Sequence, residues 1–181
     1  SSAASDVYKR QTDVNGTNPS VVVEIDGNDI DGISGFSNGG IFIDSRDGGA
    51  GVTGQANIQA TINNNDVTLT GADSAIQAYV NSGNIACLDV TNNAVAGTAT
   101  SPFTGAGSTH YIGNPVFGTT GGPGSVTYDG YIANDLGTAF LNNGNTSTAT
   151  VNPGIAGEAY VDGTQPTNGT CTTVALLKPI P

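Results

Sequence analysis

The stretch IQATINNNDV, residues 58–67, contains the pattern that predicts the fold: an alternating strand, a turn, an asparagine and one apolar residue beyond it. The same pattern occurs in VVVEIDGNDI (residues 21–30) and in ACLDVTNNAV (residues 86–95). The equivalent asparagines are Asn28, Asn65 and Asn93. Two shorter β-like runs, residues 40–43 and 75–80, precede the second and third copies. Strand, turn and strand repeated at roughly 30 residues is typical of a β-solenoid.

Stacking of the three copies would bury apolar side chains that a single copy leaves exposed. The side chains expected to lie over one another form two columns: Ile25, Ile62 and Val90, and Val23, Ala60 and Leu88. The three asparagines are expected to stack at one tight turn, because Asn tolerates left-handed backbone geometry and its amide can bond to the next copy. We therefore predict an all-β chain whose residues 20–100 form about three rungs of a right-handed parallel β-helix. A β-sandwich with Asn-rich hairpin turns is the alternative, and the fixed register of the copies disfavours it.

The remainder of the chain, residues 101–181, lacks this repeat and is predicted to cap the β-helix. Prolines and glycines in residues 101–127 predict loop with one strand over 109–117. Ile132, Leu136 and Phe140 are spaced by four residues, which predicts a short helix over 129–142 with Asp129 as N-cap. Two strands, 146–151 and 155–161, are expected to follow it.

The N-terminal segment, residues 1–19, matches nothing downstream. Its hexapeptide DVYKRQ (residues 6–11) resembles the translation of a transposon end used to prepare sequencing libraries, which suggests an assembled metagenomic sequence. We expect this segment to be a disordered or artefactual tail and exclude it from the predicted fold.

The charge balance restricts the partners. The 181 residues contain only 4 Lys plus Arg against 15 Asp plus Glu, for a formal net charge of −11. Phosphate binding needs clustered cations, so nucleic acid and anionic membrane surfaces are not expected partners. No stretch approaches the roughly 18 apolar residues that span a bilayer, so membrane insertion is not expected either. The composition favours an extracellular or cell-surface protein.

Two cysteines, Cys87 and Cys171, are far apart and do not form a CxxC motif. We expect them to form a disulfide that pins the cap to the last rung, which would suit an oxidising compartment. Two unpaired thiols are the alternative.

The chain resembles the C-terminal portion of bacterial right-handed parallel β-helix surface proteins of the "beta strand repeat-containing" type. The resemblance is carried by NIACLDVTNN (residues 84–93), by DGYIANDLGTAFLNNGN (residues 129–145) and by the late Cys171. It implies secretion and a role at the cell surface or in an extracellular matrix, within a much larger protein. It implies no catalytic residues, and the Gly-rich residues 101–127 depart from the family pattern.

Acidic residues supply the candidate sites. Asp26, Asp29 and Asp31 crowd one predicted turn, and Asp44 and Asp47 crowd another, so structural calcium is possible, although aspartate is also used to make turns. No other cofactor is expected.

Two further acidic residues offer an enzymatic alternative. Glu24 and Asp89 occupy equivalent outward positions and could form a glycoside hydrolase pair, or could be solvated surface acids. A polysaccharide lyase would need cations, and only Arg46 and Lys178 lie beyond the N-terminal segment.

The function expected from these features is non-enzymatic: an extracellular structural or adhesive β-solenoid module, or the subunit of a self-assembling fibre. Its partners would be further copies of itself or host and matrix glycans. The alternative is a carbohydrate-active or carbohydrate-binding β-helix protein, for which Tyr79, Tyr111 and Tyr131 are the candidate aromatic platforms.

Overall fold

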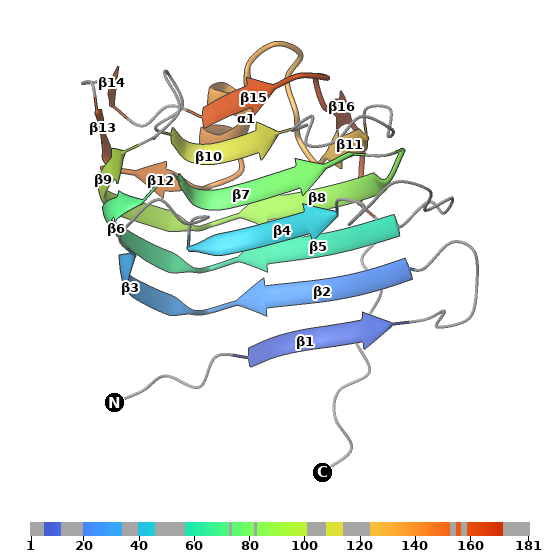
Figure 1. Ribbon diagram of the computed structural model, residues 1–181, viewed down its shortest axis with the longest axis horizontal. Coiled ribbons are helices and arrows are strands. Elements are labelled where there is room, and N and C mark those ends of the chain that lie inside the picture. The colour runs from blue at the N-terminus through green and yellow to red at the C-terminus, as the bar shows by residue number, and fades with distance from the viewer. Residues whose placement is uncertain are drawn as a thin grey trace.

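The computed structural model shows a chain made mostly of β-strands with one short α-helix (Figure 1). The residues it describes are 6–11, 20–33, 40–45, 57–72, 74–81, 83–100, 108–113, 124–152, 155–156 and 159–171. Their strands form three sheets in which neighbouring strands are mostly parallel. Among the named strands, only β1 with β2 and β13 with β14 pair in the antiparallel direction. The predicted all-β class and the parallel sheets are therefore confirmed.

Between residues 20 and 113 the chain passes through the same three sheets, in the same order, three times. We call each passage a circuit. The first circuit contains β2 (Ser20–Asp26), β3 (Asp29–Ile33) and β4 (Ile41–Ser45); the second contains β5 (Asn57–Asn63), β6 (Asp66–Ala72) and β7 (Ser74–Val80); the third contains β8 (Ile85–Thr91), β9 (Ala94–Thr100) and β10 (Ser108–Gly113). We name the sheets by their second-circuit strands: the β5 sheet, the β6 sheet and the β7 sheet.

A fourth circuit is shorter and contains the helix. Its elements are β11 (Ser125–Tyr128), α1 (Leu136–Asn142), β12 (Thr146–Ser147), β13 (Thr150–Asn152), β14 (Ile155–Ala156) and β15 (Ala159–Asp162), followed by β16 (Thr167–Asn168). In each sheet one of these strands lies beside a third-circuit strand: β11 beside β8, β13 beside β9, and β15 beside β10. Figure 1 shows them at the end of the stack opposite β1.

The interior follows the predicted register. Ile25 is aligned with Ile62, and Ile62 with Val90, in consecutive strands of the β5 sheet. The strands β5 and β8 alternate between buried and partly exposed residues, as expected where one face of a sheet is covered. Ile62 and Val90 are at most 1% exposed and belong to the core, against which the partly buried Ile25 packs.

The helix is shorter than expected and begins later. It starts at Leu136, and its N-cap is Asp135, whose carboxylate accepts a hydrogen bond from the Thr138 amide. The predicted start at Asp129 is wrong, because the Asp129 amide donates to the Leu88 carbonyl at 2.9 Å and so continues the pairing of β11 with β8. The end at Asn142 agrees with the prediction.

The N-terminal segment also differs from the prediction. Its residues Asp6–Gln11 form strand β1, which pairs with β2 along six residues. An extended segment can do this because β2 would otherwise present a row of unpaired backbone groups at the sheet edge. The predicted strand over 109–117 is observed as Ser108–Gly113, and residues 114–117 lie outside the described residues.

Candidate functional site

An asparagine ladder joins all four circuits at the corner between the β5 and β6 sheets. In the first step, the backbone amide and the Nδ2 of Asn28 both donate to Oδ1 of Asn65, at 3.0 and 2.8 Å. Asn65 donates in the same two ways to Asn93, and Asn93 to Asn145. Asn65, Asn93 and Asn145 are at most 2% exposed. The buried amides thus satisfy one another from circuit to circuit, which fixes the circuits in register.

The structure adds Asn145 to the three asparagines that the repeat predicted. The left-handed backbone conformation, expected at the ladder asparagines, occurs instead at the residue before each of them. These residues have φ of 54–77°: Gly27, Asn64, Asn92 and Gly144. The signal that could have found Asn145 is therefore a Gly or Asn followed by Asn, which Gly144-Asn145 shares with the three repeats. Sequence reasoning missed it because a turn and helix separate it from β11.

A second polar row runs along the outer face of the β5 sheet. Nδ2 of Asn63 donates to Asp26 at 3.2 Å, and Oγ1 of Thr91 donates to Asn63 at 3.0 Å. Nδ2 of Asn64 also donates to the Asp26 carboxylate, at 3.0 Å. The outward polar side chains are thus bonded to one another across circuits, and Asp26 serves this row.

The calcium candidates do not come together. In the first predicted set, Asp26 ends β2 and accepts from Asn63 and Asn64, and Asp29 and Asp31 are exposed on β3. In the second set, Asp44 is exposed on β4. In the part of the chain that the structure describes, no three His, Cys, Asp or Glu side chains are grouped so that they could hold a metal ion. Asp47 lies outside the described residues. The first predicted set thus forms no such group, whereas the set of Asp44 and Asp47 stays a prediction.

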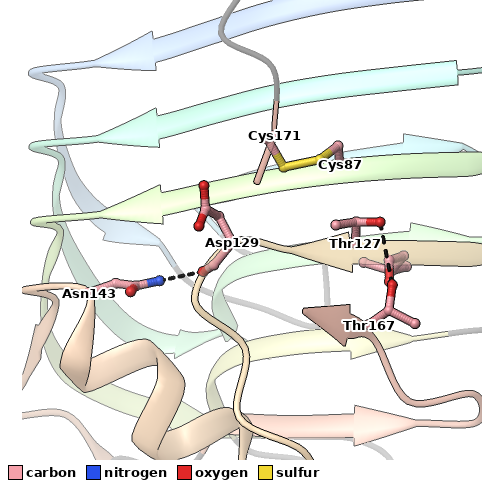
Figure 2. The surroundings of a disulfide bond; sticks show 7 residues. Cys87, Thr127, Asp129, Asn143, Thr167 and Cys171 are labelled. Atoms are coloured by element: carbon pink, nitrogen blue, oxygen red, sulfur yellow. Dashed lines mark hydrogen bonds between the residues drawn. A yellow bond between two sulfur atoms is a disulfide. The ribbon is translucent and has the colours of Figure 1, made fainter. Parts of the chain in front are cut away.

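The disulfide predicted from the sequence is present. Cys87 on β8 and Cys171, which follows β16, have Cα atoms 5.5 Å apart and a bond between their sulfurs. Figure 2 shows the bridge beside the end of β11, where Asp129 and Asn143 meet. Nδ2 of Asn143 donates to the Asp129 carbonyl at 2.7 Å, and the Thr127 and Thr167 hydroxyls are 3.4 Å apart. The bridge therefore ties the C-terminal strand to the third circuit.

Two carboxylates lie close together near this bridge. Asp89 precedes the buried Val90 on β8, and Asp129 follows the end of β11, the next strand of the same sheet. Partial burial raises the pKa of Asp89 above its usual value, and the negative charge of Asp129 raises it further. A carboxyl with a raised pKa beside a second carboxylate can exchange protons or accept hydrogen bonds from hydroxyl groups.

Glu24 and Asp89, the predicted hydrolase pair, are placed as expected but are not neighbours. Glu24 is aligned with Thr61, and Thr61 with Asp89, so two strand spacings of about 4.8 Å separate their backbones. The neighbour of Asp89 is Asp129, which the sequence did not identify because it lies outside the repeat.

His110 is buried in an aromatic cluster beneath the helix. Its ring stacks on Phe140 with centroids 5.3 Å apart and is tilted against Tyr128 at 5.6 Å. Nδ1 lies 3.0 Å from the Ile76 carbonyl, which assigns the proton to Nδ1, and Nε2 has no partner. Burial lowers the pKa of His110 to about 4, although the Ile76 carbonyl opposes this. Burial has the opposite effect on the acidic Tyr128 hydroxyl: it raises the pKa of Tyr128, and the charge of Asp89 raises it further.

An aromatic row lies on the outer face of the β7 sheet. The ring of Tyr79 meets Phe42 edge-on at 4.9 Å and Tyr111 at 5.4 Å. Gln77 is aligned with both Phe42 and Tyr111 and is 1% exposed. Tyr131, the third predicted platform, is buried elsewhere and donates to Gln165, so only Tyr79 and Tyr111 are brought together.

Comparison of the chain with protein-family models, curated proteins and solved structures finds no significant match. Among the described residues, no helix has the length and apolar character needed to cross a membrane.

Proposed function

We propose that this chain is an extracellular structural or adhesive module with the architecture of a right-handed parallel β-helix. The threefold passage through the same three sheets in one register supports the β-helix, because each circuit then acts as a rung that buries its neighbour's apolar face. The right hand is the one that parallel crossovers adopt almost without exception. The resemblance to C-terminal portions of beta strand repeat-containing surface proteins agrees with this architecture.

The observation that carries the proposal is the asparagine ladder. Four buried asparagine side chains, one in each circuit, form hydrogen bonds that hold the circuits to one another. Such bonds lie inside the molecule and serve mechanical stability of the stack. The outward row of Asp26, Asn63 and Thr91 extends the same arrangement to the surface.

The disulfide supports the extracellular location. Disulfides persist in secreted and surface proteins and are rare in reducing compartments. The Cys87–Cys171 bridge closes a sequence separation of 84 residues and secures the last strand, β16, against β8 through its neighbour β11. A surface module exposed to proteases and shear would gain from that closure.

The experiment is to display the oxidised protein on beads and to measure retention on immobilised matrix proteins and glycans under flow. In parallel, soluble protein is incubated with a panel of neutral and acidic polysaccharides. We expect retention and no release of reducing ends. Release that is lost in both Asp89→Asn and Glu24→Gln, but kept in Thr61→Ser between them, would contradict the non-catalytic role.

Carbohydrate binding is a second candidate, and the aromatic row favours it. Tyr79, flanked by Phe42 and Tyr111, places an aromatic surface on the outer face of the β7 sheet, and aromatic rings are large, rigid contact surfaces. Tyr79→Ala should reduce binding on a glycan array at least tenfold, whereas Thr98→Ala on the β6 sheet should leave it unchanged. Equal binding by both variants would exclude the aromatic row as the site.

A further inference from the structure

The two ends of the asparagine ladder are chemically different. Along the ladder, each asparagine donates its backbone amide and Nδ2 to Oδ1 of the asparagine in the following circuit. Each Oδ1 therefore faces the N-terminal end of the stack, whereas the backbone amide and one of the two Nδ2 hydrogens face the C-terminal end. At the C-terminal end of the ladder, Nδ2 of Asn145 needs an acceptor. At the N-terminal end, Oδ1 of Asn28 needs donors.

The C-terminal end of the ladder is closed by the helix. In the inner circuits, Nδ2 bonds to a strand carbonyl of the preceding circuit and to the next Oδ1, as Asn93 does with Ile62 and Asn145. Nδ2 of Asn145 keeps the first bond, to the Val90 carbonyl at 2.8 Å. Its second bond goes to the Phe140 carbonyl of α1, at 2.7 Å. The helix thus supplies the acceptor that a further asparagine would have supplied.

The N-terminal end of the ladder is open. Oδ1 of Asn28 is buried and has no hydrogen-bond partner, although the same atom in Asn65, Asn93 and Asn145 accepts two bonds. Asn28 itself is only 7% exposed, so water does not reach this oxygen freely. A buried acceptor without a partner costs about 1–3 kcal/mol. The position is therefore shaped for two N–H donors.

The strands and apolar side chains around Asn28 are also less covered on the side that faces the N-terminal end of the stack. In the described part of the chain, β3 and β4 are end strands of their sheets, whereas β2 is covered by β1. Ile25 and Ile30 are partly exposed, but their equivalents in the second circuit, Ile62 and Val67, are 1% exposed. Among the residues that the structure describes, none thus covers Ile30 or the outer edges of β3 and β4, at the end where the ladder lacks its donor.

We infer that this N-terminal end is a docking face for one further circuit of the same kind, carried upstream on the same polypeptide. That circuit would take the place of β1 beside β2 and bring parallel strands to β3 and β4. It would also bring an apolar residue over Ile30 and an asparagine whose backbone amide and Nδ2 donate to Asn28. A second copy of this chain does not fit, because the Nδ2 hydrogens at its own C-terminal end are already bonded to Val90 and Phe140. The inference rests on the β-helix architecture proposed above and not on the extracellular role.

The test is to insert a second copy of residues 57–84 between Pro19 and Ser20 in the full chain. This copy ends where the second circuit meets β8, so it joins β2 in the native register. Amide hydrogen exchange in β3 and β4 should slow at least tenfold relative to the unaltered chain. The matched control carries Asn65→Ala in the inserted copy alone, and it should lose most of that protection.

Unchanged exchange in β3 and β4, or equal protection by the two insertions, would overturn the inference. So would protection in the unaltered chain that rises with its concentration, because the face would then belong to a second copy. If the insertions do not fold, Asn28→Ala and Asn65→Ala are compared in the unaltered chain. Asn28→Ala should change the unfolding equilibrium at least tenfold less, and equal changes would overturn the open ladder end. None of these outcomes depends on the polysaccharide assay.

Discussion

The second and third circuits and the C-terminal part of the molecule are stabilised in different ways. In the two circuits, the same contacts recur: an aligned apolar column, a ladder asparagine and a positive-φ residue before it. In residues 124–171 each contact occurs once, as in the stacked rings of His110 and Phe140 and the disulfide at Cys171. A repeat can propagate indefinitely with one set of interactions, but its end must be closed by side chains that fit only there.

This difference predicts which perturbations spread. Loss of a contact in the C-terminal part should loosen that part alone, whereas loss of a ladder residue should affect the circuits on both sides.

The disulfide joins the two regions, so its removal should have the largest effect. We expect the double variant Cys87→Ser and Cys171→Ser to lose about 4.5 kcal/mol of unfolding free energy, as chain-entropy reasoning gives for a loop of this length. Denaturant unfolding measures the loss, and hydrogen exchange locates it. Exchange should rise in β11 and β16 and stay unchanged in β5. A rise spread evenly over all circuits would contradict the division between the two regions.

Asn93 belongs to the repeating region and contacts the circuits on either side. Asn93→Ala removes the Oδ1 that accepts from Asn65 and the Nδ2 that donates to Asn145 and to the Ile62 carbonyl, while the backbone amide of residue 93 remains. Several buried polar groups would then lack partners, so we expect a loss of about 3 kcal/mol with faster exchange in both neighbouring circuits. The control is Asn92→Gly, which keeps the positive φ and removes only an exposed bond to Asn63. Equal losses in the two variants would show that the ladder adds nothing.

The sequence predicted the repeating region well and the C-terminal part poorly, for a physical reason. The column of Ile62 and the ladder step at Asn65 depend on periodic side chains, and periodicity is visible in a single sequence. The helix start at Asp135 and the ladder step at Asn145 depend on where a unique turn leads the chain. Asp129 looked like an N-cap because its residue type suits one, yet its backbone completes the pairing of β11.

His110, on β10 of the third circuit, gives the contact between that circuit and the helix a pH dependence that the asparagine ladder lacks. Its pKa is about 4 in the folded chain and near 6.5 in the unfolded chain, so the unfolded state binds more protons between these values. Its contribution is complete above pH 6.5 and is lost as the pH falls toward 4. We expect the unfolding free energy to be about 2 kcal/mol lower at pH 5 than at pH 7.5.

The matched variant for this prediction is His110→Gln, which cannot titrate in this range. Its unfolding free energy should be nearly equal at pH 5 and pH 7.5, even if it is lower at both. The same slope in His110→Gln and in the unaltered chain would assign the pH dependence to other groups.

The smallest effect is expected where the two regions meet on the outer face, at Asp89 and Asp129. Because burial and the Asp129 charge raise the pKa of Asp89, its ionised form destabilises the folded chain at neutral pH. The effect is small, since much of the side chain is exposed and screened. Asp89→Asn should raise the Tm by about 1 °C at pH 7.5. The gain should shrink in 1 M salt, which screens Asp129, and should vanish at a pH where Asp89 is already protonated.

Glu24→Gln, in the same outward row but two circuits away from Asp89, should show no such gain. If it gains as much as Asp89→Asn, the benefit comes from lowering the net charge of −11 and not from the meeting of the two carboxylates.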